Sequence, residues 1–163
     1  MKKVLQFSGI ICVLLALVAF VLMMATPAMT AKGLFSDGTI AGTVAIFGDD
    51  SGLLSIKPSV LALIGWILLL VGILVALFGV VLPFLKVKGI AKFAGLLNVV
   101  AVFCFVLAGV FMFLVVPTFA SANEVRADYL SIRPGWVIGG ILAIAAGVFA
   151  ILPAAADFLA KKK

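Results

Sequence analysis

The chain contains no histidine, and its two cysteines, Cys12 and Cys104, both lie inside long apolar runs. Without histidine, the sequence lacks the commonest general base and the commonest ligand of transition metals. Two cysteines cannot supply a tetrahedral zinc site or a disulfide framework. We therefore expect no metal site, no cofactor and no enzymatic activity, since neither thiol has a supporting base in the sequence around it.

Charged residues are also scarce, because they make up 11% of the 163 residues whereas hydrophobic residues make up 66%. This composition excludes an ordinary soluble domain. It also disfavours ion pathways and proton-coupled carriers, which depend on ionisable side chains inside the membrane. The uncharged stretches run from Lys3 to Lys32, Lys57 to Lys86, Lys92 to Glu124 and Arg133 to Asp157.

Transmembrane helices need about 20 consecutive apolar residues, and four stretches of the chain meet this requirement. They cover residues 4–25, 60–85, 93–116 and 136–156, and they leave the loops 26–57 and 117–134 on one side. Pro58 and Pro134 stand at helix starts, whereas Pro117 and Pro153 stand at or just inside helix exits. The sequence therefore predicts an all-α membrane protein with one domain, residues 1–163. We expect a left-handed bundle of four helices with a small extracellular β element.

Lysines set the orientation, because short loops rich in Lys and Arg stay in the cytoplasm. The lysines at 2–3, 86–92 and 161–163 share one side, whereas the other side has a slight negative excess. We place both termini in the cytoplasm of a cell membrane, and the scarcity of cysteine is typical of a prokaryotic protein. The net charge of +6 then reflects contact with anionic lipids and gives no reason to invoke nucleic acid.

The first apolar stretch also resembles a secretory signal, because Lys2 and Lys3 precede it. Its apolar run is too long for that role, and its exit lacks a small-x-small cleavage site. We therefore favour an uncleaved helix.

Two segments of the chain are nearly the same, since residues 54–58 read LSIKP and residues 130–134 read LSIRP. The helices that follow also end alike, with VLP at 81–83 and ILP at 151–153. We infer a duplicated helical hairpin, whose parallel copies are related by an axis along the membrane normal. Chance similarity between apolar sequences is the alternative.

Small residues recur at seven-residue spacing within the predicted helices. Such spacing keeps one seam facing a neighbour in a left-handed supercoil, and small side chains let the backbones approach closely. The seams pack either the core of the monomer or the contact between subunits. Their members are Gly65, Gly72, Gly79, Ala94, Ala101, Ala108, Gly140 and Gly147.

The residues of the first outer loop are those whose pattern indicates a β-strand. Asp37-Gly38 is a hairpin-turn signal, and GDDSG at 48–52 reads as a second turn, which we prefer to a calcium site because the spacing of a calcium loop is missing. Residues 39–47 between these turns are β-prone and uncharged, so an unpaired edge here would be a template for another strand. Residues 53–56 or the second loop are alternative covers for that edge. The candidate interface residues are Thr39, Ile40, Val44, Ile46 and Phe47.

Lys57, Arg133 and Trp136 flank the starts of two predicted helices, where they would anchor the chain at the membrane interface. Lys57 and Arg133 would also contact lipid phosphates. The general plan of four helices with a larger first loop resembles that of claudins and tetraspan proteins. Residues 26–57, however, contain neither the tryptophan nor the cysteines of the claudin first loop.

The sequence favours a structural or interaction protein that assembles laterally, with itself or with another membrane protein, through its helix seams and its outer strand. The alternative is a channel or transport component whose pore forms between subunits. Such a pore needs polar helix faces, and these helices offer few polar side chains.

Overall fold

A computed structural model describes residues 2–32, 37–51, 55–81 and 94–160. Four of its helices are long and apolar enough to cross a membrane, as predicted. The lysines of 86–92 and 161–163 and the predicted helix end at 82–85 lie outside the described residues. The four helices are α1 (Lys2–Ala25), α3 (Val60–Val81), α4 (Ala94–Phe113) and α6 (Pro134–Ala160).

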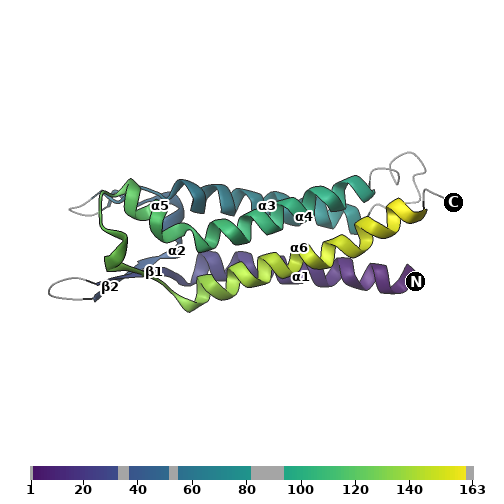
Figure 1. Cartoon of the computed structure of the whole chain (residues 1–163), viewed down its shortest axis with the longest axis horizontal. Coiled ribbons are helices and arrows are strands. Elements are labelled where there is room, and N and C mark those ends of the chain that lie inside the picture. Colours follow the sequence, from purple (N-terminus) through teal and green to yellow (C-terminus); the bar gives the residue numbers. More distant parts are fainter. Residues whose placement is uncertain (1, 33–36, 52–54, 82–93, 161–163) are drawn as a thin grey trace.

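The four helices form an elongated bundle in which Lys2 and Ala160 lie at the same end (Figure 1). Helix α4 packs against both α3 and α6, and α1 packs mainly against α6. Contact between α1 and α3 is the sparsest of the four neighbouring pairs. The described spans thus form a ring of helices that is most open between α1 and α3.

The glycines of α3 meet α4 along its whole length. A Cβ atom at Gly72 would lie 2.7 Å from Cε1 of Phe105, and one at Gly79 would lie 2.6 Å from Oδ1 of Asn98. Gly65 faces Phe111 and the carbonyl of Ala108. These three glycines therefore form one seam within the chain.

Helix α6 brings a second glycine seam to the other side of α4. A Cβ at Gly147 would lie 2.8 Å from Cγ2 of Val106, and one at Gly140 would lie 3.0 Å from the ring of Phe113. Ala101 and Ala108 are fully buried between the helices. Both seams are therefore occupied by the chain's own helices.

Two helix ends differ from the predictions. Helix α4 ends at Phe113, and after Leu114 the chain starts a short helix, α5 (Val115–Ala122), which contains Pro117. Pro117 is the third residue of α5, where its missing N–H has no intrahelical acceptor to lose. Helix α6 extends to Ala160, beyond the predicted end at residue 156, and it contains Pro153, because a proline in an apolar helix removes only one hydrogen bond.

The end of the bundle opposite Lys2 and Ala160 carries a group of short elements, which we call the cap (Figure 1). Three antiparallel strands form a sheet with the order β2-β1-β3. Helix α2, helix α5 and the 3₁₀ helix η3 complete the cap. The elements not yet bounded are β1 (Pro27–Lys32), β2 (Asp37–Ala41), α2 (Gly42–Phe47), η3 (Ala127–Tyr129) and β3 (Leu130–Ile132).

The strand predicted over 39–47 is wrong beyond Ala41, because residues 42–47 form helix α2. Gly42 lies against the end of α1, where its N–H donates to the carbonyl of Thr26 at 3.1 Å. A Cβ at Gly42 would lie 2.1 Å from the carbonyl oxygen of Met23, so only glycine fits there. The β propensity of valine, isoleucine and phenylalanine is a weak preference, and burial of α2 on the bundle overrides it.

The predicted position of the hairpin turn is also wrong, since Asp37 and Gly38 belong to β2 itself and pair with Lys32 and Ala31. Strand β1, for which the sequence gives little signal, lies in the centre of the sheet. It follows α1 almost directly, so the end of the first helix positions the whole sheet.

Candidate interaction site in the cap

Strand β2 has one paired edge and one edge that no other described strand pairs. It pairs with β1, and β3 lies on the far side of β1. Ile56 of the neighbouring segment pairs with Asp49 instead of β2. Of the candidate interface residues, Thr39 and Ile40 therefore lie on an edge strand, with Thr39 exposed and Ile40 half-buried.

The other three candidate interface residues lie on α2. Ile46 is fully buried, and the ring of Phe47 meets that of Trp66 edge to face with centroids 5.3 Å apart. Val44 is half-buried, and its carbonyl accepts a hydrogen bond from Gly48. These side chains attach α2 to the bundle, so they do not belong to a strand edge.

The two faces of the sheet differ in polarity. Strand pairing aligns Met29 with Ile40 and with Ile132, and it aligns Ala31 with Leu130. The alternate row consists of hydroxyl side chains, Thr39, Thr30 and Ser131. Since side chains alternate along a strand, one face of the sheet is apolar and the other is polar.

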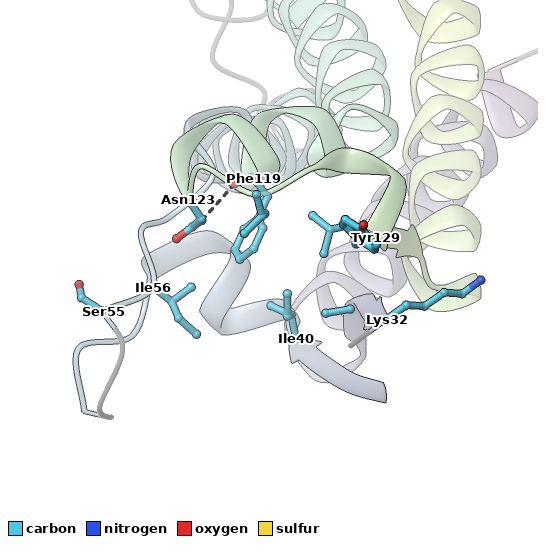
Figure 2. A pocket seen from close by; sticks show the side chains of 10 residues that line it. Lys32, Ile40, Ser55, Ile56, Phe119, Asn123 and Tyr129 are labelled. Carbon is cyan, nitrogen blue, oxygen red and sulfur yellow. Dashed lines mark hydrogen bonds between the residues drawn. The ribbon is translucent and has the colours of Figure 1, made fainter. Parts of the chain in front are cut away.

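A cavity of about 590 Å³ lies on the apolar face of the sheet (Figure 2). This volume falls within the range of small-molecule pockets. In Figure 2, Phe119 of α5 and Asn123, which directly follows α5, form its upper side, Ile40 its lower side and Ile56 one flank. Its lining residues are Ala31, Lys32, Ile40, Ser55, Ile56, Phe119, Asn123, Val125, Tyr129 and Leu130.

Asn123 fixes one wall of this cavity. Its Oδ1 accepts a hydrogen bond from the N–H of Lys57 at 2.8 Å, and its Nδ2 donates to the carbonyl of Lys57 at 2.9 Å. Nδ2 also donates to the carbonyl of Phe119 at 3.1 Å. The Asn123 amide thus pairs with both the N–H and the C=O of Lys57, as a neighbouring strand would. It therefore joins the end of α5 to the segment around residue 57.

The loop that carries Ile56 is held by the two aspartates of GDDSG. Oδ1 of Asp49 accepts hydrogen bonds from the hydroxyl of Ser51 at 2.6 Å and from its N–H at 2.9 Å. These two bonds lower the pKa of Asp49 from its ordinary value of 3.8. The Ser55 hydroxyl donates to Asp50. Asp49 therefore acts as a turn residue, and the described residues contain no cluster of three metal-ligating side chains.

Two of the predicted interfacial anchors are exposed at helix starts, and the third is not. Lys57 and Arg133 are exposed, and the Arg133 N–H donates to the carbonyl of Ala28 at 2.9 Å. Trp136 is 0% exposed, so its side chain is covered by the chain itself. Its ring lies beneath Gly42, whose missing side chain leaves the space, and its Nε1 has no partner among the described residues.

Sequence reasoning missed most of the cavity. Phe119, Asn123 and Leu130 lie in the predicted second loop, and nothing in their spacing indicates that they face Ile56. The repeated LSI segments were the available signal, since one contributes Ile56 and the other Leu130. Comparisons with protein-family models, with curated proteins and with solved structures find no match to this chain. The functional argument therefore rests on geometry.

Proposed function

We propose that the chain is a structural or interaction membrane protein that binds a second copy of itself, or another membrane protein, through its cap. The observation that carries this proposal is the outer edge of β2, which no other strand among the described residues pairs. Unpaired backbone N–H and C=O groups on an edge strand are a template for an added strand. Residues 38–41 of β2 bear no charge that would oppose such pairing.

The glycine seams support the same assignment by exclusion. Gly72 and Gly147 meet Phe105 and Val106 of the same chain, so these seams are not free for another subunit. Lateral contacts within the membrane would have to use bulky lipid-facing side chains such as Phe78. We therefore place the main partner contacts in the cap.

Three finer features belong to this proposal. The excess of lysine at the end of the termini supports a cytoplasmic location for that end and an extracellular cap. The seven-residue spacing of small residues supports a left-handed supercoil. The similar segments at 54–58 and 130–134 support two parallel hairpin repeats.

The alternative, a pore formed between subunits, would need polar side chains on the outer helix faces. The large side chains exposed on α1 and α3 are apolar, among them Phe7, Leu14, Leu74 and Phe78. Those faces suit contact with lipid acyl chains.

Site-specific photocrosslinking tests the proposal. A benzophenone amino acid replaces Thr39 on β2 or, as the matched control, Ser131 on β3, in cells that express the chain. Both positions are exposed and belong to the same hydroxyl row of the sheet. Strand β3 is the other edge strand, but it has only three residues and so offers few backbone groups to an added strand. We expect a discrete adduct from position 39 and none from position 131.

Mass spectrometry of the adduct, and the particle mass in lipid nanodiscs, then show whether the partner is a second copy. Equal crosslinking at both positions, or none at position 39, would overturn the assignment of β2 as the contact.

A further inference from the structure

The cavity and the edge of β2 that no described strand pairs meet at Ile40. This residue lies on the edge strand, and its side chain forms one side of the cavity. In Figure 2, Ile56 and Ser55 stand on one flank of the cavity, and Tyr129 and Lys32 stand on the other. A strand added to the edge of β2 would therefore run beside a preformed apolar hollow.

The chemistry of the lining defines what can enter. Lys32 is the one charged residue among the ten that line the cavity, and its ammonium group extends away from it in Figure 2. Asn123 already donates to and accepts from the Lys57 backbone. Because the remaining walls are mainly isoleucine, leucine, valine and phenylalanine side chains, an entering group must be uncharged and apolar.

The position of the cavity separates a lipid from a peptide as occupant. None of the ten lining residues belongs to the stretches of the four long helices that are apolar enough to cross a membrane, and Phe119 lies on α5 beyond the end of α4. A lipid chain would have to leave the hydrocarbon to reach this site and would gain little, because the bilayer is equally apolar. An apolar side chain presented from water gains the full free energy of burial.

The alternation of the sheet adds a geometric requirement. Ile40 is aligned with Met29 and Ile132, so this row faces the cavity side of the sheet. In a fourth strand, every second side chain would point to the same side. Strand addition commonly works in this way, with backbone pairing giving affinity and pockets for alternate side chains giving selectivity.

We propose that the cavity receives one large apolar side chain of an extended peptide segment that pairs with β2 as a fourth strand. This inference rests on the proposed function and specifies its partner: an uncharged segment with apolar residues at alternate positions and one large aromatic or aliphatic side chain among them.

Peptide probes test this inference on the full chain in lipid nanodiscs. The first probe is a fluorescent, end-capped octapeptide that alternates threonine and valine and has one central phenylalanine. The second has serine in place of phenylalanine, and we expect it to bind at least about tenfold more weakly, since burial of a phenylalanine side chain is lost. N-methylation of every second residue, made in both registers, should abolish binding of the first probe in one register.

Variants of the protein provide the reciprocal test. Ala31→Phe and Val125→Trp fill the cavity from two different walls, so that a folding failure in one leaves the other informative. Each should lower the affinity for the phenylalanine peptide to that for the serine peptide, with helix content and thermal midpoint near those of the parent. Leu74→Phe is the control, because Leu74 is 49% exposed on α3 and lies outside the cap.

The possible results separate this inference from the proposed function. Equal binding of the phenylalanine and serine peptides would overturn the role of the cavity. Undiminished binding of both methylated peptides would overturn strand addition, and displacement of the peptide by decanoate at equal affinity would identify an amphiphile site instead. If no peptide binds while position 39 still crosslinks to a partner, the inference fails and the proposed function stands.

Discussion

Single glycines decide how closely the helices of this bundle approach one another. Gly72 is the clearest case, because any Cβ there would overlap the ring of Phe105. In lipid, close backbone approach replaces the hydrophobic effect as a source of helix association. The seven-residue spacing of small residues can therefore be recognised in the sequence, because the same steric requirement recurs every two helical turns.

Substitutions along these seams should be far more damaging than substitutions on the lipid face. We expect Gly72→Leu and Gly147→Leu each to destabilise the fold by at least about 2 kcal/mol, because the added side chains force the helices apart. Leu74 is 49% exposed, so Leu74→Ala should cost less than about 0.5 kcal/mol. Thermal unfolding in detergent measures these differences. Wild-type stability of both glycine variants would mean that the bundle relaxes around the seam.

Asp49 provides a test of the cap at the scale of one carboxyl group. Its pKa is lowered in the folded state, so its contribution to stability is present above the ordinary value of 3.8 and is lost as pH falls through the folded value. Ser51→Ala removes the larger cause, the hydroxyl hydrogen bond, and keeps the backbone one. We expect the pKa of Asp49, followed by NMR titration, to rise towards 3.8 in this variant. An unchanged titration would assign the shift to another group.

Other individual residues could not be predicted, because their roles depend on distant partners. Asn123 reads as an ordinary loop residue until Lys57 is placed beside it. Trp136 reads as an interfacial tryptophan because it lies at a helix start. In the structure Trp136 is buried, because the chain returns at Gly42 and covers the start of α6.

At the scale of elements, the four spans follow from apolar length alone, whereas the cap does not. A run of apolar residues as long as the bilayer is thick has few alternatives. The short segment 42–47 has β-prone residues in a helix, and β1 contains proline and alanine in a central strand. Such short segments gain more from tertiary burial than from their own preference.

Two substitutions in α2 distinguish its helical form from the strand that the sequence predicts. Val44 is the third residue of α2, so Val44→Pro should be tolerated as Pro117 is at the third position of α5. Ile46 is fully buried, so Ile46→Lys should destabilise the cap by at least about 3 kcal/mol. Protease resistance and thermal unfolding report both effects. If residues 42–47 formed a strand with Ile46 facing solvent, Val44→Pro would be the damaging substitution and Ile46→Lys the tolerated one. That result would contradict the helix.

The whole molecule has a cap at one end and its termini at the other, and this polarity should define its orientation in the membrane. In a chain whose two native cysteines are replaced, we expect Ile40→Cys to react with an impermeant thiol reagent from outside the cell. Lys88→Cys should react only after the membrane is opened if the lysine-rich side lies in the cytoplasm, as we propose. Labelling at position 88 in intact cells would reverse the topology.

The preference of α1 for α6 over α3 has a consequence for biosynthesis. The ribosome completes α1 first and α6 last, so the first helix to enter the membrane must wait for the final one to find its main neighbour. In the interval, α3 and α4 can join through their glycine seam as a local hairpin, which closes a much shorter loop. Helix α1 meanwhile holds β1, the centre of the sheet, in place. Assembly of the cap is therefore tied to arrival of the last helix, and a chain stalled after α4 would expose its first helix to the quality-control machinery of the membrane.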